Sequence, residues 1–212
     1  MQRTVLTLTL VSLLSLAACT AESRVGTVRE KASRGDARAE ALMGEMYANG
    51  TDVPQDYGQA AVWWTKSAAD GYPQAEYNLG VLYEHGQGVA RSDARAAEWY
   101  GRAARQGLAA AQYNMGVFYE HGRGVQQNLP EAVAWYRKAG EQGNADAQFN
   151  LGALYARQGQ AAEAYYWLSL AAKIGDHDAE RMRDKMAGQL APAQADDVRR
   201  RVNTFRAVVV TG

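Results

Sequence analysis

The chain of 212 residues contains a single cysteine, Cys19, so no internal disulfide can form and the fold must be held by its packed core. It also lacks an excess of either charge, because 23 basic residues balance 23 acidic ones. Without residues 1–18 the chain has 22 basic and 23 acidic residues, which still gives no electrostatic attraction for nucleic acid or an anionic membrane. We therefore expect no nucleic-acid partner. The basic run Arg199-Arg-Arg201 is interpreted as a solvated capping face.

Sequence motifs of catalysis are missing as well. There is no Gly-x-Ser-x-Gly nucleophile elbow and no Ser-x-x-Lys motif. The glycine pairs Gly86-Gln-Gly88 and Gly122-Arg-Gly124 do not follow a predicted strand, as a phosphate-binding loop would. We therefore predict a protein without catalytic residues, bound metal or cofactor.

Long apolar runs are limited to one segment, Val5 to Leu16, which follows Arg3 and is too short to cross a bilayer comfortably. A basic flank, a short apolar core and small residues indicate a secretory signal peptide over residues 1–18. The ending Leu16-Ala-Ala-Cys19 resembles the bacterial lipobox, whose cysteine is lipidated. The alternative is an ordinary signal peptide with an incidental Cys19.

The lipobox resemblance implies that residues 19–23 form a lipid anchor and a short tether. Thr20, rather than Asp, follows the cysteine. By resemblance to sorted lipoproteins, this implies an outer-membrane location with the protein facing the periplasm.

What the chain does have is a period of 36 residues. Glycine, tyrosine and tryptophan recur on this step, which is the signature of a repeat protein. The tryptophan series shortens once, because Trp167 follows Trp135 by 32 residues, so four residues are missing between Tyr155 and Trp167. The recurring residues are Gly44, Gly80, Gly116 and Gly152; Tyr47, Tyr83, Tyr119 and Tyr155; and Trp63, Trp99 and Trp135.

Each copy predicts two helices. In the second copy, Leu79 and Tyr83 belong to an apolar stripe with helical spacing, which predicts helix A. Gly86 and Gly88 then allow a left-handed exit and a tight turn. A second stripe that includes Trp99 predicts helix B, which Gly107 ends. The repeat is therefore helix A, a glycine-rich loop, helix B and a glycine turn.

These residues resemble the Sel1-like repeat, a relative of the tetratricopeptide repeat. The resemblance implies an all-α fold, an α/α superhelical solenoid of about four repeats with helix A on its concave side. Residues 24–175 form the array, and residues 24–36 form a degenerate cap in which Thr27 takes the tryptophan position. Residues 177–212 are expected to form capping helices, over Ala179–Leu190 and Ala193–Ala207, and a tail. The four repeats are residues 37–72, 73–108, 109–144 and 145–176.

Asparagine recurs in the middle of helix A, where it is a poor helix former. By resemblance to tetratricopeptide repeats, the ladder would contact a peptide in the groove, and aromatic residues flank it. The basic residues of a carboxylate clamp are missing, since their positions hold Gln74, Ala110 and Asp146. The alternative is a structural asparagine between helices. The predicted site consists of Asn78, Asn114 and Asn150 with Tyr77, Tyr113 and Phe149.

Two other recurring groups have alternative interpretations. His85 and His121 each follow a glutamate, which is compatible with metal binding, but a histidine also suits a helix C-terminus. The Trp-Tyr pairs of helix B are compatible with an aromatic cage, but their stripe must pack between repeats. In both cases we favour the structural interpretation.

The sequence thus predicts a monomeric, non-enzymatic scaffold that binds a partner protein or peptide in the cell envelope on its concave face. Two alternatives stay open. One is an exported cell-wall or β-lactam hydrolase, an activity of related proteins that are rich in paired cysteines. The other is a regulator of a membrane signalling partner.

Overall fold

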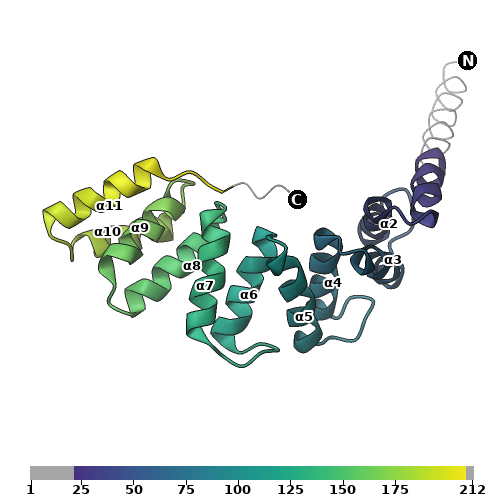
Figure 1. The fold of residues 1–212 in the computed structure, drawn as a ribbon, viewed down its shortest axis with the longest axis horizontal. Coiled ribbons are helices and arrows are strands. Elements are labelled where there is room, and N and C mark those ends of the chain that lie inside the picture. The colour runs from purple at the N-terminus through teal and green to yellow at the C-terminus, as the bar shows by residue number, and fades with distance from the viewer. Residues whose placement is uncertain (1–21, 209–212) are drawn as a thin grey trace, which may run out of the picture. The chain divides into compact units, whose positions relative to one another are not determined.

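A computed structural model describes residues 22–208, in which every regular element is an α-helix (Figure 1). The described residues form two compact units, which divide between Ser92 and Asp93. Residues 22–33 are helical and precede the first unit's complete helices, α2 (Ala37–Asn49), α3 (Tyr57–Ala69) and α4 (Pro73–His85). The second unit contains α5 (Asp93–Arg105), α6 (Ala109–His121), α7 (Leu129–Glu141), α8 (Ala145–Arg157), α9 (Ala161–Ala172), α10 (His177–Ala187) and α11 (Pro192–Thr204).

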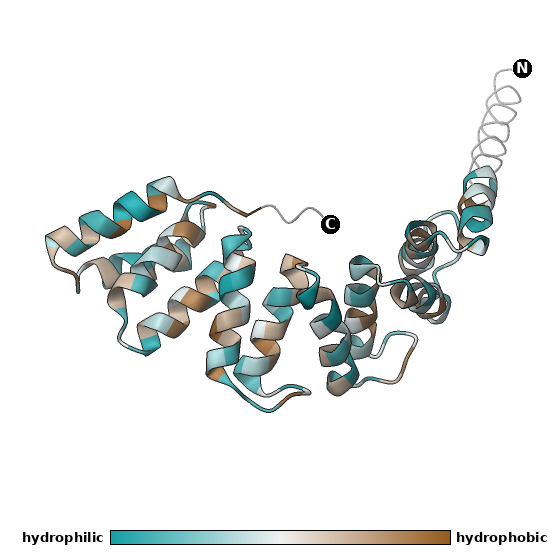
Figure 2. Cartoon of the chain, in the orientation of Figure 1, coloured by the Kyte–Doolittle hydropathy of each residue, from teal (hydrophilic) through white to brown (hydrophobic). Residues whose placement is uncertain are grey.

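The predicted all-α repeat fold is confirmed. Helix A of the four repeats is α2, α4, α6 and α8, and helix B is α3, α5, α7 and α9. Within each unit, the two helices of a repeat pack together and helix B also packs on the next helix A. The core recurs with the period, because one large apolar residue of each helix A is at most 4% exposed: Met46, Leu82, Phe118 and Leu154. Figure 2 shows that the helices carry hydrophobic and hydrophilic residues side by side.

The glycine ladder of helix A allows helix B to come close. A Cβ atom on Gly116 would lie 2.4 Å from the ring of Tyr136. A Cβ on Gly44 would lie equally close to the indole of Trp64, at 2.4 Å. Real Cβ atoms do not approach other heavy atoms so closely, so this position must be glycine for the ring of helix B to lie flat against helix A. Helix packing therefore explains why this glycine recurs.

A seven-residue loop joins the two helices of the first three repeats. Gly50, Gly86 and Gly122 end their helices in the left-handed conformation, with φ near 68°. Asp56 and Asn128 then cap α3 and α7, since each side chain accepts a hydrogen bond from a backbone N–H of the first turn. These short polar side chains satisfy donors that a helix start leaves unpaired.

The second glycine of the loop crosses the start of the preceding helix B. Gly124 has φ 64°. A Cβ atom there would lie 2.2 Å from the carbonyl oxygen of Asp93, at the start of α5. Gly88 crosses the start of α3 in the same way, with a would-be Cβ 2.3 Å from the backbone of Tyr57. The loop of one repeat therefore covers the first turn of helix B in the repeat before it.

The first repeat has Asp52 where the other loops have this glycine. Asp52 keeps the left-handed conformation, with φ 61°. Its carboxylate pairs with the guanidinium of Arg24 in the first described helix, with Nε to Oδ2 at 3.2 Å. The departure from glycine thus ties the first repeat to the helix before it.

The two ends of the array make contacts like those between repeats in its middle. Arg29 donates a hydrogen bond to the hydroxyl of Tyr47, and Arg137 of helix B donates to the hydroxyl of Tyr155 at the same spacing. Residues 22–33 therefore pack against the first repeat as a helix B would. At the other end α11 packs on α9, and Ala195, Val198 and Val202 are buried.

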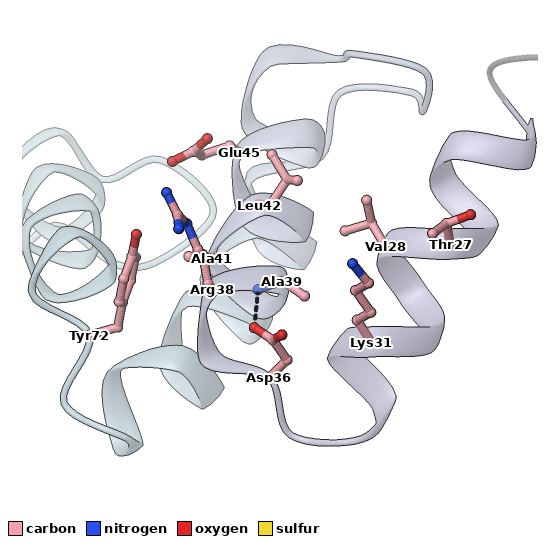
Figure 3. A pocket seen from close by; sticks show the side chains of 10 residues that line it. All are labelled: Thr27, Val28, Lys31, Asp36, Arg38, Ala39, Ala41, Leu42, Glu45 and Tyr72. Atoms are coloured by element: carbon pink, nitrogen blue, oxygen red, sulfur yellow. Dashed lines mark hydrogen bonds between the residues drawn. The ribbon is translucent and has the colours of Figure 1, made fainter.

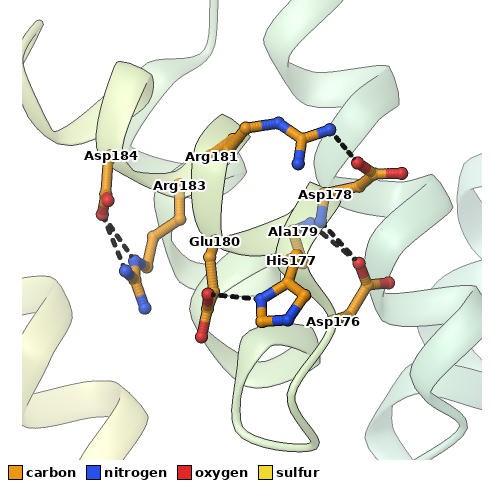
Figure 4. Close-up of polar contacts among 8 residues, drawn as sticks. All are labelled: Asp176, His177, Asp178, Ala179, Glu180, Arg181, Arg183 and Asp184. Atoms are coloured by element: carbon orange, nitrogen blue, oxygen red, sulfur yellow. Dashed lines mark hydrogen bonds and ion pairs between the residues drawn. The ribbon is translucent and has the colours of Figure 1, made fainter.

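Helix α10 begins at His177, two residues before the predicted start. Asp176 caps this helix, because its Oδ1 accepts hydrogen bonds from the N–H groups of Asp178 and Ala179 (Figure 4). Because Asp176 caps the helix, α10 begins at the next residue, His177. His177 itself pairs with Glu180 on the exposed side of the first turn.

A buried polar position also recurs on helix A, at residues 40, 76, 112 and 148. Gln112 donates to the carbonyl oxygen of Ala104, and Gln148 donates to that of Gly140. Glu40 is only 6% exposed, and its Oε2 atom has no hydrogen-bond partner among the described residues. Burial raises the pKa of Glu40, and the nearby Asp70 carboxylate raises it further.

We expect Glu40→Gln to stabilise the protein by about 1 kcal/mol at neutral pH, because an amide can donate to a carbonyl as Gln112 and Gln148 do. The folded state holds the Glu40 proton more tightly than the unfolded state. Stability from this group is therefore lost as the pH rises from about 4.5 through the raised pKa. Urea unfolding of the variant across this range should show a weaker pH dependence. Glu45→Gln, on the same helix but partly exposed, is the matched control and should change little.

Candidate functional site

The asparagine ladder lies on helix A of repeats two to four, and all three side chains are half-buried. Asn78 belongs to the N-terminal unit, where its Oδ1 accepts from Gln74 Nε2 at 3.2 Å. Asn150 of the C-terminal unit donates from Nδ2 to the Tyr136 hydroxyl at 3.4 Å. In the range 22–208 the Asn114 amide has no hydrogen-bond partner from the protein. Three equivalent residues are therefore engaged in three different ways.

The aromatic residues beside the ladder are also half-buried. Tyr113 packs against Tyr136 of α7 with ring centroids 5.9 Å apart. Burial raises the pKa of Tyr113, the Asp146 carboxylate raises it further, and a hydrogen bond with Asn150 opposes both. Phe149 has the equivalent position on α8, and Tyr77 has it on α4 in the N-terminal unit. The C-terminal unit thus places Tyr113, Asn114, Phe149 and Asn150 on two neighbouring helices A.

A polar network continues from these residues. The Tyr136 hydroxyl donates to Glu120 Oε2 at 3.0 Å, and Arg157 Nη2 pairs with Glu120 Oε1 at 2.7 Å. Burial raises the pKa of Tyr136 strongly, and the charge of Glu120 adds to this, so the phenol stays protonated. The network joins α6, α7 and α8 and fixes Asn150 beside Tyr136. Its function is therefore to hold one asparagine of the ladder in place.

In the first three repeats, a cationic side chain lies over the ring of the helix B tryptophan that recurs with the period. Lys66 Nζ lies 4.2 Å from the ring of Trp63, and Lys138 Nζ lies 4.2 Å from that of Trp135. Arg102 lies over Trp99 at 4.7 Å in the same way. Each cation follows its tryptophan by three residues, which places both on one helix face. A side chain of the protein therefore takes the position that an aromatic cage would offer to a ligand.

The first repeat replaces the asparagine by Leu42, which is 42% exposed. A pocket of about 420 Å³ opens around it, between the helix of residues 22–33 and α2. Figure 3 shows that Val28 and Lys31 line it from the first described helix, while Arg38 and Glu45 line it from α2. Acidic and basic side chains are both present, so the pocket does not select one sign of charge. The first repeat therefore offers an apolar contact where the others offer an amide.

The histidines do not form a site. His121 bonds through Nδ1 to the Val117 carbonyl, one turn earlier on the same helix, at 3.0 Å. Among the described residues no group of three or more His, Cys, Asp or Glu side chains could hold a metal ion. His85 ends α4 in the N-terminal unit. The placement of His121 suits the structural interpretation.

The basic run of α11 is paired with acidic side chains. Arg199 pairs with Asp196 and Arg200 with Asp197, one turn earlier on the helix. Arg201 pairs with Glu163 of α9 at 3.1 Å and lies over the ring of Tyr166. A run bound in this way acts as a capping face.

Two further expectations concern the membrane. Cys19, the predicted lipidation site, lies outside the described residues, as does the signal peptide. Over residues 22–208, no helix has the length and apolar character needed to cross a membrane.

Some features of these surfaces were missed by sequence reasoning. Glu120 and Arg157 carry the network around Asn150, but nothing in their spacing signals that they meet. The cations Lys66, Arg102 and Lys138 could have been found, because they recur every 36 residues and follow each tryptophan by three. In the first repeat, Arg38 occupies the position at which a carboxylate clamp has its basic residue, and which is not basic in repeats two to four. The ladder position four residues later is Leu42 and not asparagine.

Together, the helix pairs, their shared core and the recurring loop contacts define an all-α repeat protein. Its residues 37–72, 73–108, 109–144 and 145–176 match the sequence profile of the Sel1 repeat, so the chain belongs to the Sel1 repeat family. Proteins with these repeats generally mediate protein–protein interactions, and the scaffold is typically non-catalytic.

Solved structures similar to the chain include the following two. One is a protective antigen present in uropathogenic Escherichia coli strains, with 34% identity, a TM-score of 0.74, and coverage of 83% of this chain and 40% of that one. The other is a Sel1 repeat protein from Oxalobacter formigenes, with 38% identity, a TM-score of 0.70, and coverage of 78% and 49%. The chain thus spans less than half the length of either structure. No curated protein matches it.

Proposed function

We propose that this chain is a lipid-anchored interaction scaffold of the bacterial envelope, which binds a partner protein or peptide on helices A of its C-terminal unit. The observation that carries the proposal is the contrast between two equivalent asparagines. Asn150 is held by Tyr136, whereas the half-buried Asn114 amide keeps its hydrogen-bonding groups for water or a ligand. Asn78 and Asn150 bond to neighbouring side chains, so Asn114 is the asparagine of the ladder whose amide is available to a ligand.

The aromatic residues of the same two helices, α6 and α8, make this surface suited to a peptide. Tyr113 and Phe149 are half-buried, so part of each ring is available for apolar contact. An amide near aromatic rings can bond a peptide backbone while the rings contact its side chains, and a few such groups carry most of the energy of an interface. The network of Glu120, Tyr136 and Arg157 keeps this surface in one arrangement, which lowers the ordering cost of binding.

Photo-crosslinking in the envelope tests this surface. A photoreactive residue at position 114 should give a discrete adduct with a partner, whereas the same residue at Val62, which is 50% exposed on α3, should not. Asn114→Ala should remove the partner and change the free energy of unfolding by less than about 0.5 kcal/mol. Equal adducts at both positions would contradict the proposed surface. So would a loss of folding stability without any change in partner recovery.

The anchor is tested separately. Cys19→Ser should abolish metabolic labelling with palmitate and release the protein from membranes, because one thiol would carry the lipid that holds it there. Membrane fractionation of the variant, with wild type as the reference, measures the effect. Undiminished labelling of Cys19→Ser would exclude lipidation at this residue, and the crosslinking result would then stand without the anchor.

A further inference from the structure

The short connection between α8 and α9 uncovers a surface that the complete loops cover elsewhere. In the first three repeats seven residues join helix A to helix B, but only residues 158–160 join α8 to α9. The missing part corresponds to the glycine that crosses the preceding helix B, as Gly88 crosses Tyr57 and Gly124 crosses Asp93. On the same period the next covered residue would be Leu129, at the start of α7.

Leu129 is exposed as this comparison requires. Its exposed fraction is 39%, whereas Tyr57 and Asp93 at the same position are half-buried. A pocket of about 450 Å³ opens beside it. Leu154 also lines this pocket, and the Glu120–Arg157 ion pair forms part of its wall. We call this the α7 notch, and its lining residues are Glu120, His121, Gln127, Leu129, Leu154, Arg157 and Gln158.

The complete loops show what fits such a notch. Their glycine comes so close to the backbone of helix B that a Cβ atom has no room. The valine that follows, Val89 or Val125, is half-buried. The residue before the glycine contacts the helix start, since Arg123 pairs with Asp93 at 3.3 Å. Leu129 replaces that aspartate in the notch, so an apolar residue fits there better than an arginine.

We propose that the α7 notch binds an extended segment of a partner protein, of the form apolar-Gly-Val, which takes the place of the missing loop. The segment supplies in trans the backbone contact that Gly88 and Gly124 make within the chain. Burial of Leu129 and of the partner's apolar side chains supplies the attraction. Glycine is required because the backbone must approach the start of α7 closely. The notch shares the Glu120–Arg157 ion pair with the network behind the Asn114 surface, but the partner segment would contact Leu129 and not the asparagine.

A short peptide tests the notch. The probe is a fluorescently labelled heptapeptide, His-Gly-Leu-Gly-Val-Gln-Gln, which is the sequence of residues 121–127 with leucine for Arg123. Its binding to the full-length chain in detergent is followed by fluorescence anisotropy. We expect saturable binding with a Kd of roughly 0.1–1 mM, which is usual for a small apolar contact. The same peptide with alanine for its second glycine should bind at least about tenfold more weakly.

Two variants of the chain locate the binding. Leu129→Asp installs the residue that starts α5, so the helix start should survive. This variant should bind the leucine peptide about tenfold more weakly. It should bind more tightly the peptide with the unchanged sequence of residues 121–127, here called the arginine peptide, because an Asp–Arg pair becomes possible. A chain with the seven-residue loop Gly122–Asn128 in place of residues 158–160 should not bind either peptide. Val62→Asp is the matched control, and its Kd should equal that of wild type.

Three results would overturn the proposal. The first is the absence of saturable binding up to about 5 mM peptide. The second is equal binding to the chain with the restored loop. The third is a concentration-dependent dimer in analytical ultracentrifugation that Leu129→Asp dissociates, because a second copy would then occupy the notch. None of these results bears on crosslinking at Asn114, so the two surfaces can fail independently.

Discussion

Gly124→Ala should lower the free energy of unfolding by about 3 kcal/mol, from backbone strain and steric overlap together. Gly124 adopts φ 64°, which costs an L-residue energy that glycine does not lose. The new methyl group would also meet the carbonyl oxygen of Asp93 at 2.2 Å, and neither backbone can move without disturbing α5. Urea denaturation followed by circular dichroism measures the change.

Gly159→Ala separates the two costs. Gly159 has φ 72°, but nothing lies within 4 Å of an added Cβ. This variant should therefore lose only the conformational part, about 1 kcal/mol. Equal losses for the two variants would show that the loop does not press on the start of α5. That result would also weaken the comparison on which the α7 notch rests.

Gly116→Ala should lower the free energy of unfolding by about 2–3 kcal/mol through overpacking alone, because Gly116 lies inside α6 with ordinary helical geometry. The added methyl would lie 2.4 Å from the ring of Tyr136, whose hydroxyl is held by Glu120. The ring cannot turn away without breaking that hydrogen bond. Thermal unfolding should show a lower Tm.

Gly26→Ala is the control for helix propensity. Gly26 is exposed in the first described helix, and nothing lies within 4 Å of an added Cβ. Alanine there should stabilise the protein by about 0.5–1 kcal/mol, since it is the better helix former. Opposite signs for Gly116→Ala and Gly26→Ala would show that the glycine ladder is kept for contact between helices. A small effect at Gly116 would mean that Tyr136 can repack.

The helices could be predicted from the sequence because residues close to each boundary determine where a helix begins or ends. Gly86 and Gly122 end helices A, and Asp56 and Asn128 begin helices B, each through its own backbone or side-chain geometry. The start of α10 was predicted two residues late, although Asp176 gave the signal for the cap. That error came from following the apolar pattern, which begins after the first turn of the helix.

The engagement of the asparagine ladder could not be predicted in the same way. Asn114 and Asn150 have similar neighbours in sequence, an aromatic residue before and an apolar residue after, and what separates them is tertiary contact. Asn150 reaches the Tyr136 hydroxyl across the boundary between two repeats, whereas Asn114 has no such partner among the described residues. A period shows which residues are equivalent, but not which of them a neighbouring repeat satisfies.

The α7 notch shows the same limit. The loss of four residues before Trp167 is visible in the sequence. What the loss uncovers is not visible, because it depends on the loop of one repeat lying on helix B of the repeat before. Only the contacts of Gly88 and Gly124 reveal that a change near residue 159 exposes Leu129, 30 residues earlier.

The cations over Trp63, Trp99 and Trp135 bear on contacts between molecules at high protein concentration. A half-buried indole with an uncovered face would give neighbouring molecules an apolar surface to adhere to. Lys66, Arg102 and Lys138 each cover one such surface and carry a charge into the water above it. Each of these three repeats thereby keeps a large aromatic ring while a charged side chain shields one of its faces.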